Sequence, residues 1–175
     1  RLSTVYMPGY KITMLPDEVV QRYTLQEGRD CPALSLYVSF DEVTLQQQSS
    51  ETRMERVPIA ANLRHDQLDH VVTQAWLENP NFAHDAHVAL PAMPREQLSF
   101  LFRLAQHLKA QREVVRGKPE TFNRPDYNFR LVGKDGQAPQ GHEQVEISVR
   151  QRGAPLDLMV AEAVSYTHLT LPTKA

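Results

Sequence analysis

VYMPGYKITMLPDEVVQRYTLQEGRDCPALSLYVS, residues 5–39, is the stretch that decides the fold of this chain. The run Pro16-Asp17-Glu18 predicts a short helix that ends near Tyr23, because proline and acidic side chains suit a first helical turn. Residues 33–40 then alternate between apolar and polar side chains, which predicts a half-buried strand. Its apolar face carries Leu34, Leu36, Val38 and Phe40.

Outside this stretch, the first half of the chain gives weaker signals. Residues 1–16 are rich in turn-forming residues, and the polar run at 44–52 predicts a loop. A second strand is expected near 53–59, close to an edge or to its own end because Pro58 cannot donate to a sheet. Residues 65–78 predict a helix that ends at Asn79-Pro80 and is followed by a loop. Its apolar stripe contains Leu68, Val71, Val72 and Ala75.

The second half contains the clearest helix, over residues 94–116, which Gly117 is expected to end. Strands are predicted at 127–132 and 145–149, joined by a hairpin-like loop. Another helix begins after Pro155 and reaches about Ala163. The order of these elements lacks strict βα alternation, so we expect an α+β fold with mixed, mostly antiparallel strands packed with helices.

Composition limits the class of protein. The chain has 175 residues and a formal net charge of −2, which gives no overall basic signature for nucleic acid. Cys31 is the single cysteine, so a reduced, cytoplasmic compartment is expected. No apolar run is long enough to cross a membrane, and no signal peptide follows Arg1. The absence of an initial Met suggests that the true beginning is missing.

Ordered motifs within residues 5–39 resemble the catalytic domain of the ribonuclease II-type (RNB) family. The family pattern Tyr-Leu-Pro corresponds to Tyr6-Met7-Pro8, and Met14-Leu15-Pro16 matches its Met-Leu-Pro. Ala33-Leu34-Ser35 matches its Ala-Leu-Ser strand. The segments NLRHDQLD, RPDYNF and RGAPLDLMVAEAV, which begin at Asn62, Arg124 and Arg152, resemble later parts of the family. The resemblance covers residues 1–164, a partial RNB-like domain within an RNB-type nuclease core.

The resemblance implies a ribonuclease that hydrolyses single-stranded RNA from 3′ to 5′ to nucleoside monophosphates. RNA would be threaded into a channel, and magnesium held by clustered aspartates would activate water. Those aspartates precede the Tyr-Leu-Pro segment in the family, so they would lie before Arg1. We therefore expect that this chain alone has no metal site and no activity. The complete protein is expected to be a monomer. The alternative is a non-catalytic RNA-binding or regulatory protein with a degenerate RNB domain.

The resemblance also suggests RNA-contacting residues. Tyr6 matches an aromatic that stacks on a base, although a core or turn tyrosine beside Pro8 is the simpler interpretation of the residue alone. His65 could stack or could lie at a helix start, and Phe122 could contact RNA or belong to the core. Glu162 is a weak catalytic candidate near the terminal nucleotide, or an exposed residue. Here Ala161 replaces the first glutamate of the family's pair.

The sequence does not favour a phosphate-binding helix, a metal site or a reactive cysteine in this chain. The basic residues of the 94–116 helix are spread around it, which favours a solvated face over a phosphate-binding stripe. His84 and His87 lack further ligands at zinc spacing. Asp66 and Asp69 favour a solvated face over a metal pair, and Cys31 is expected to be a buried small residue.

The last eleven residues, SYTHLTLPTKA, show no helical period. The string resembles adapter sequence read through at the end of a contig. We therefore expect residues 165–175 to be a non-native tail that does not continue the preceding helix, the alternative being a real strand-like segment.

Overall fold

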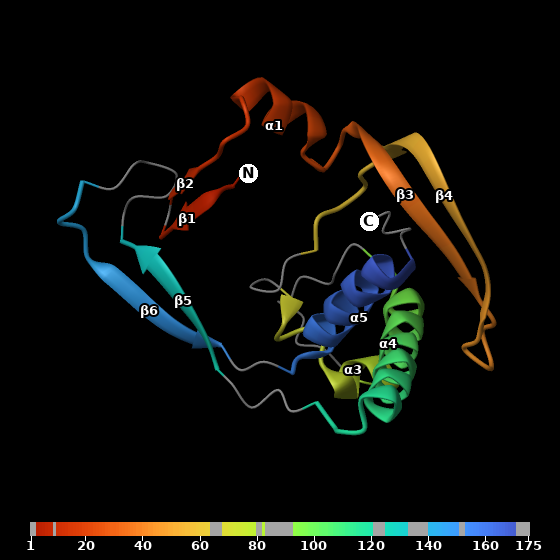
Figure 1. Cartoon of the computed structure of the whole chain (residues 1–175). Helices are drawn as coiled ribbons and strands as arrows, with labels where there is room; N and C mark the ends of the chain where they lie inside the picture. Colours follow the sequence, from red (N-terminus) through yellow and green to blue (C-terminus); the bar gives the residue numbers. More distant parts are fainter. Residues whose placement is uncertain are drawn as a thin grey trace. The chain divides into compact units, whose positions relative to one another are not determined.

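The computed structural model describes residues 3–8, 10–63, 68–79, 82, 93–120, 125–132, 140–150 and 153–170. The chain forms two compact units, whose elements are labelled in Figure 1. The first unit combines Arg1–Leu25 with Asn123–Arg152, and the second combines Gln26–Phe122 with Gly153–Ala175. Each unit is therefore built from two segments that are distant in the sequence.

The first unit begins with a small antiparallel hairpin of β1 (Val5–Met7) and β2 (Tyr10–Ile12). Residues 1–16, which are rich in turn-forming residues, therefore also contain two short strands that the sequence did not predict. Strands of three residues are too short to show a period of two, so the sequence pattern does not reveal them. Helix α1 (Asp17–Tyr23) follows Pro16 and confirms the predicted helix.

A second hairpin in the first unit pairs β5 (Asp126–Leu131) with β6 (Val145–Arg150), as predicted. Its two faces differ sharply, because residues of like character lie opposite each other across the strands. One face is polar and carries Asp126, Asn128, Arg130, Glu146, Ser148 and Arg150. The other carries Tyr127, Phe129, Leu131, Val145, Ile147 and Val149, and all of these except Leu131 are about half exposed.

The second unit contains the long antiparallel hairpin of β3 (Asp30–Phe40) and β4 (Gln47–Pro58). Strand β3 extends the prediction for residues 33–40, and β4 ends at Pro58 as expected. The predicted loop at 44–52 is wrong from Gln47 onward, because β3 provides hydrogen-bonding partners for a polar segment whose own pattern does not predict a strand. The tight turn is held by Asp41, whose Oδ1 accepts hydrogen bonds from the backbone N–H groups of Val43 (3.0 Å) and Thr44 (2.7 Å).

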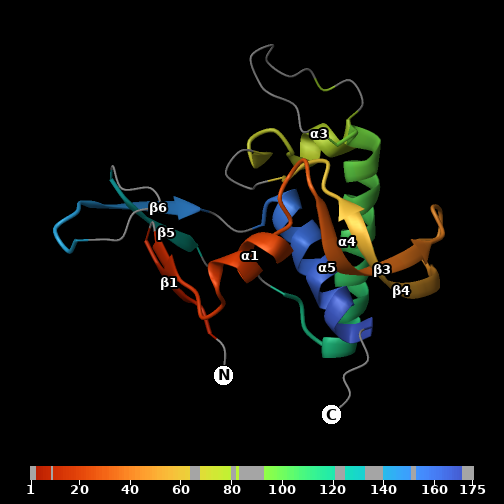
Figure 2. The ribbon, with the colours of Figure 1, turned by 90° about the horizontal axis from the view of Figure 1, so that it is seen from above.

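Among the residues that the structure describes, helices α3, α4 and α5 belong to the second unit, and Figures 1 and 2 show α4 and α5 side by side. Helix α3 (Gln74–Glu78) is shorter than the helix predicted over 65–78. Thr73 has an extended backbone and its side chain accepts a hydrogen bond from the N–H of Trp76, so a new helix starts there. Ala75, predicted to be buried, is exposed, whereas Trp76 and Leu77 are buried.

Helix α4 (Arg95–Arg116) confirms the prediction over 94–116, and Gly117 ends it in the left-handed region at a φ of 69°. Helix α5 (Pro155–Thr170) begins where expected but continues through much of the last eleven residues. The expectation that this segment does not continue the helix is wrong as far as Thr170. Its sequence contains no glycine or proline before Pro172, so nothing in the covalent chain stops the helix earlier.

The core of the second unit forms where α3, α4 and α5 meet. Its buried side chains are Leu68, Val72, Trp76, Leu77, Leu98, Phe102, Ala105, Leu156 and Met159. These helices and antiparallel strand pairs confirm the α+β fold class. Within the described ranges, no helix has the length and apolar character needed to cross a membrane.

Candidate nucleic-acid interface

Tyr6 lies in the middle of β1 and presents its ring to solvent. Its exposed fraction, 79%, is the largest among the aromatic side chains whose exposure the structure describes. Val5 and Met7 occupy the other face of the strand, where Val5 is also exposed and Met7 is half-buried. The alternative interpretation of Tyr6 as a core residue is therefore wrong.

Lys11 lies directly opposite Tyr6 on β2 and is also exposed. Residues directly opposite each other in an antiparallel pair share one face of the sheet. The hairpin therefore presents an aromatic ring and an ammonium group together, on the face opposite Val5 and Ile12. Sequence reasoning found Tyr6 through its motif but missed Lys11, because only the strand register brings the two together.

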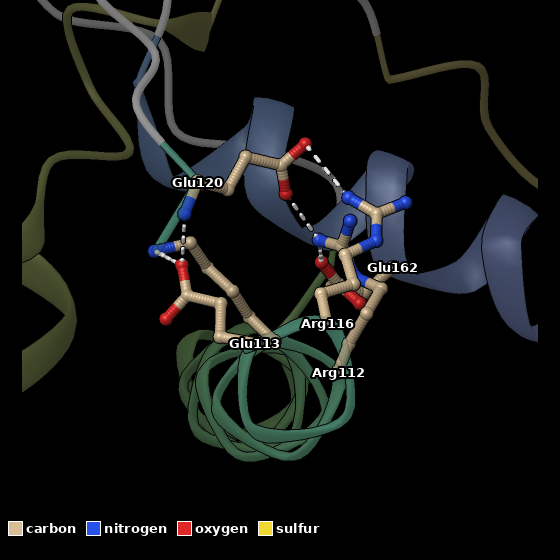
Figure 3. Close-up of polar contacts among 6 residues, drawn as sticks. Arg112, Glu113, Arg116, Glu120 and Glu162 are labelled. Carbon is tan, nitrogen blue, oxygen red and sulfur yellow. Dashed lines mark hydrogen bonds and ion pairs between the residues drawn. The ribbon is translucent and has the colours of Figure 1, made fainter. Parts of the chain in front are cut away.

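Glu162 lies in a cluster of charged residues between α4 and α5, not on the surface. Its exposed fraction is 3%, so the alternative of an exposed Glu162 is wrong. The side chain accepts a hydrogen bond from Arg112 of α4 (Figure 3). Spacing offered a signal for this burial, since Leu156, Met159 and Glu162 share one helix face and the first two belong to the core.

Arg112 is the centre of this cluster. Besides Glu162, its Nη2 lies 2.6 Å from Oε2 of Glu120, a residue shortly after the end of α4 (Figure 3). Burial alone would lower the pKa of Arg112, but hydrogen bonds to Glu120 and Glu162 outweigh it and raise the pKa above its usual value. The guanidinium is therefore firmly charged, and the cluster fixes both α5 and the segment after α4 to one side chain of α4.

Two further contacts secure the same segment. The backbone N–H of Glu120 donates to Glu113 at 2.8 Å, and this bond, followed by that from Lys109, holds the pKa of Glu113 below its usual value. Arg116 lies 3.7 Å from the carboxylate of Glu120. Lys109, Arg112 and Arg116 are thus all paired with glutamates, which argues against a phosphate-binding stripe. The expected solvated face is wrong for Arg112, whose side chain is only 19% exposed.

An apolar cavity of about 510 Å³ lies within the second unit, beside Glu162. Its walls come from β3 and from helices α4 and α5, including Leu36, Val38, Phe40, Leu101, Leu108 and Val160. Among the described residues of its lining, Glu162 alone is charged, and Arg112 already engages its carboxylate. The cavity was not anticipated from the sequence. The alternation of β3 correctly placed Leu36, Val38 and Phe40 on one inward face, but the inclusion of Leu34 in that face is wrong, since Leu34 is 62% exposed.

The remaining predicted positions give a mixed outcome. Cys31 is fully buried, with its Sγ 3.9 Å from the carbonyl oxygen of Arg29, which confirms the expectation of a small buried residue. The structure brings no group of three or more histidine, cysteine, aspartate or glutamate residues together as a metal site among the residues it describes. Several positions lie outside the described residues, namely His65, Asp66, His84, His87, Phe122 and Arg124.

Comparison with known protein families accounts for the ordered motifs found in residues 5–39 and in the later segments of the sequence. The model of the RNB domain matches residues 1–171, nearly the whole chain. A search of curated proteins gave no match. The match covers the Tyr6 hairpin, both units and α5 through Thr170, further than the resemblance seen in the sequence. The chain therefore belongs to the RNB domain family, a family of nucleases that hydrolyse RNA.

Proposed function

We propose that the complete protein is a 3′-to-5′ exoribonuclease in which this chain provides contacts to single-stranded RNA. In this proposal, RNA is threaded into a channel and released as nucleoside monophosphates. The observation that carries the proposal is the RNB match across residues 1–171. The exposed ring of Tyr6 supports it, because this residue occupies the Tyr-Leu-Pro position of the family motif.

Tyr6 suits an enzyme that must accept every base. All four bases offer a π-face, so stacking on an aromatic ring supports binding without sequence preference. A stacked base contributes about 1–3 kcal/mol in alanine substitutions. The ring of Tyr6 is open to solvent within the described residues, and its neighbours on β1 point to the other face, so a base can approach it.

We propose that the complete protein uses magnesium, which would neutralise phosphate charge and activate water when bound. The described residues do not fit a magnesium site. Hard cations need several carboxylate or carbonyl oxygens, whereas Glu162 is engaged by Arg112, and Asp41 accepts hydrogen bonds from Val43 and Thr44. We therefore place the metal ligands outside the described residues and expect the 175-residue chain alone to bind RNA without cleaving it.

A non-catalytic RNA-binding or regulatory protein is the second candidate. The lack of a three-ligand cluster among the described residues favours it over a self-sufficient nuclease. The two candidates differ in the complete protein, which would degrade RNA with magnesium in the first case and only bind RNA in the second.

A binding assay tests the shared part of both candidates. We expect the chain to bind a fluorescein-labelled single-stranded oligouridine in a fluorescence anisotropy titration. Tyr6→Ala should weaken binding by about 1–3 kcal/mol, and Tyr6→Phe should retain most of it, because stacking needs the ring. Tyr23→Ala is the matched control, since Tyr23 is an exposed tyrosine at the end of α1. Equal effects of Tyr6→Ala and Tyr23→Ala would contradict the proposal.

Product analysis then separates binding from hydrolysis. We expect no nucleoside monophosphates when the chain is incubated with the same RNA and magnesium. Release of monophosphates that stops with a chelator would contradict the expectation that the chain alone does not cleave RNA. The same assay on the complete protein decides between the two candidates.

We also propose that the complete protein works as a monomer in the cytoplasm. The burial of Cys31, the chain's single cysteine, is compatible with a reduced compartment.

A further inference from the structure

We propose that Lys11 binds the phosphate of the nucleotide whose base stacks on Tyr6, so that the β1–β2 hairpin holds base and backbone together. This inference rests on the proposed RNA contact of Tyr6 and extends it to the charged part of the ligand. The ligand class is a single-stranded nucleic acid recognised by a base face and an adjacent phosphodiester.

The strand register carries the first step of the argument. Tyr6 and Lys11 are direct partners across β1 and β2, and directly opposite residues have Cβ atoms about 4.5–5.5 Å apart. Both side chains are exposed on the same face. A lysine side chain is a flexible stem with a compact charge at its end, so its ammonium group can reach past the edge of a ring stacked on a base.

The charges around the hairpin carry the second step. Residues 1–16 contain no aspartate or glutamate, and the nearest carboxylates in the sequence, those of Asp17 and Glu18, belong to the first turn of α1 and not to the hairpin. Within the described residues, Arg53, Lys109, Arg112 and Arg116 form ion pairs with glutamates, and Lys11 is in none of these pairs. The basic residues of α4 that are paired with glutamates are poor phosphate ligands by comparison.

The opposite face of the hairpin carries the third step. Val5 and Met7 on β1 share that face with Ile12 on β2, and no charged side chain lies among them. The hairpin is therefore amphipathic, and Tyr6 and Lys11 lie together on the face opposite these apolar side chains. A positively charged surface that interleaves with an aromatic platform is the usual solution for binding single strands without sequence preference.

Salt dependence tests the assignment, because each phosphate contact on a single strand changes the slope of log Kd against log salt by about 0.7. We expect Lys11→Gln in the full chain to make the slope for fluorescein-labelled oligouridine shallower by about this amount. At ~0.1 M salt, one such contact corresponds to about fivefold weaker binding. Lys118→Gln is the matched control, since Lys118 is an exposed lysine just after α4, and it should leave the slope unchanged.

A strand of abasic sites separates the two halves of the proposed contact. Lys11→Gln should weaken binding of this strand as it does for oligouridine, whereas Tyr6→Ala should have little effect on it. A Lys11→Gln slope equal to that of the unchanged chain, with Tyr6→Ala still weakening oligouridine binding, would overturn the Lys11 assignment alone. Absence of oligouridine binding by the unchanged chain would overturn both the Lys11 assignment and the proposed function.

Discussion

Loss of the positive charge at Arg112 should destabilise the second unit more than any surface substitution. The side chain of Glu162 is 4% exposed and that of Arg112 is 19% exposed, so this ion pair lies largely out of water. Removing one partner of a buried pair costs about 3–5 kcal/mol, because the remaining charge is left uncompensated. We expect Arg112→Met to lower the free energy of unfolding by ~3 kcal/mol, near the lower end of this range, since Arg112 retains some contact with water.

Urea unfolding followed by tryptophan fluorescence measures this loss. Trp76 is the single tryptophan of the chain and lies in the core with α4 and α5, so its emission reports on the unit that contains the pair. With a denaturant slope of about 2 kcal/mol per molar urea, ~3 kcal/mol moves the midpoint by about 1.5 M. Arg116→Met is the matched control on the same helix, and it should cost under ~1 kcal/mol because Arg116 is half exposed.

The double variant Arg112→Met with Glu162→Leu tests the cause of the loss. Replacement of a whole buried pair by apolar side chains is often neutral or stabilising, so the double variant should recover most of the stability lost by Arg112→Met. A loss below ~1 kcal/mol for Arg112→Met, or a double variant less stable than the single one, would refute the reasoning that an uncompensated Glu162 is the origin of the cost.

Two other predictions concern the first unit. The pKa of Glu143 is lowered to about 2, chiefly by a hydrogen bond from the backbone N–H of Gln140. Because a depressed pKa in the folded state favours the charged form, this contribution should be complete above pH 4.5 and disappear as the pH falls toward 2. An NMR titration of the Glu143 carboxyl should give a midpoint near 2, and a midpoint near 4.5 would contradict the bond. The half-exposed apolar face of β5–β6 should make the isolated chain marginally stable and prone to aggregation, so Ile147→Lys should reduce light scattering at a given concentration. Ser148→Lys on the polar face is its control, and equal light scattering by the Ile147→Lys, Ser148→Lys and unchanged chains would contradict this expectation.

Helices and strands long enough to show a clear hydrophobic periodicity were predictable from the sequence. The alternation after Cys31 identified β3, and the apolar stripe through Leu98 and Phe102, bounded by Pro94 and Gly117, identified α4. Elements that depend on pairing with another strand were not predictable. The polar start of β4 is an example, because it is a strand only through its pairing with β3. Local side-chain hydrogen bonds were also missed, since the cap at Thr73 divides what reads as one continuous helix.

The candidate site was only partly predictable. Tyr6 could be found because its surrounding motif is local in the sequence. Lys11 needed the register of two very short strands, and the partner of Glu162 lies 50 residues away on another helix. Contacts of this kind depend on tertiary packing, so a sequence pattern shows that Glu162 shares a buried face but not which residue compensates its charge.

The interleaving of the two units has a consequence for folding during synthesis. The first unit needs Asn123–Arg152 to complete what Arg1–Leu25 began, and the second needs α5, which follows this insertion. At about 5–20 residues per second, the Tyr6 hairpin waits several seconds on the ribosome before the rest of its unit exists. Helix α4 leaves the ribosome with Arg112 and its apolar face uncovered until Glu162 and the rest of α5 emerge. The nascent chain therefore has no completed unit to protect its apolar surfaces until Arg152 has emerged, and chaperone demand should be highest for the interval between α4 and α5.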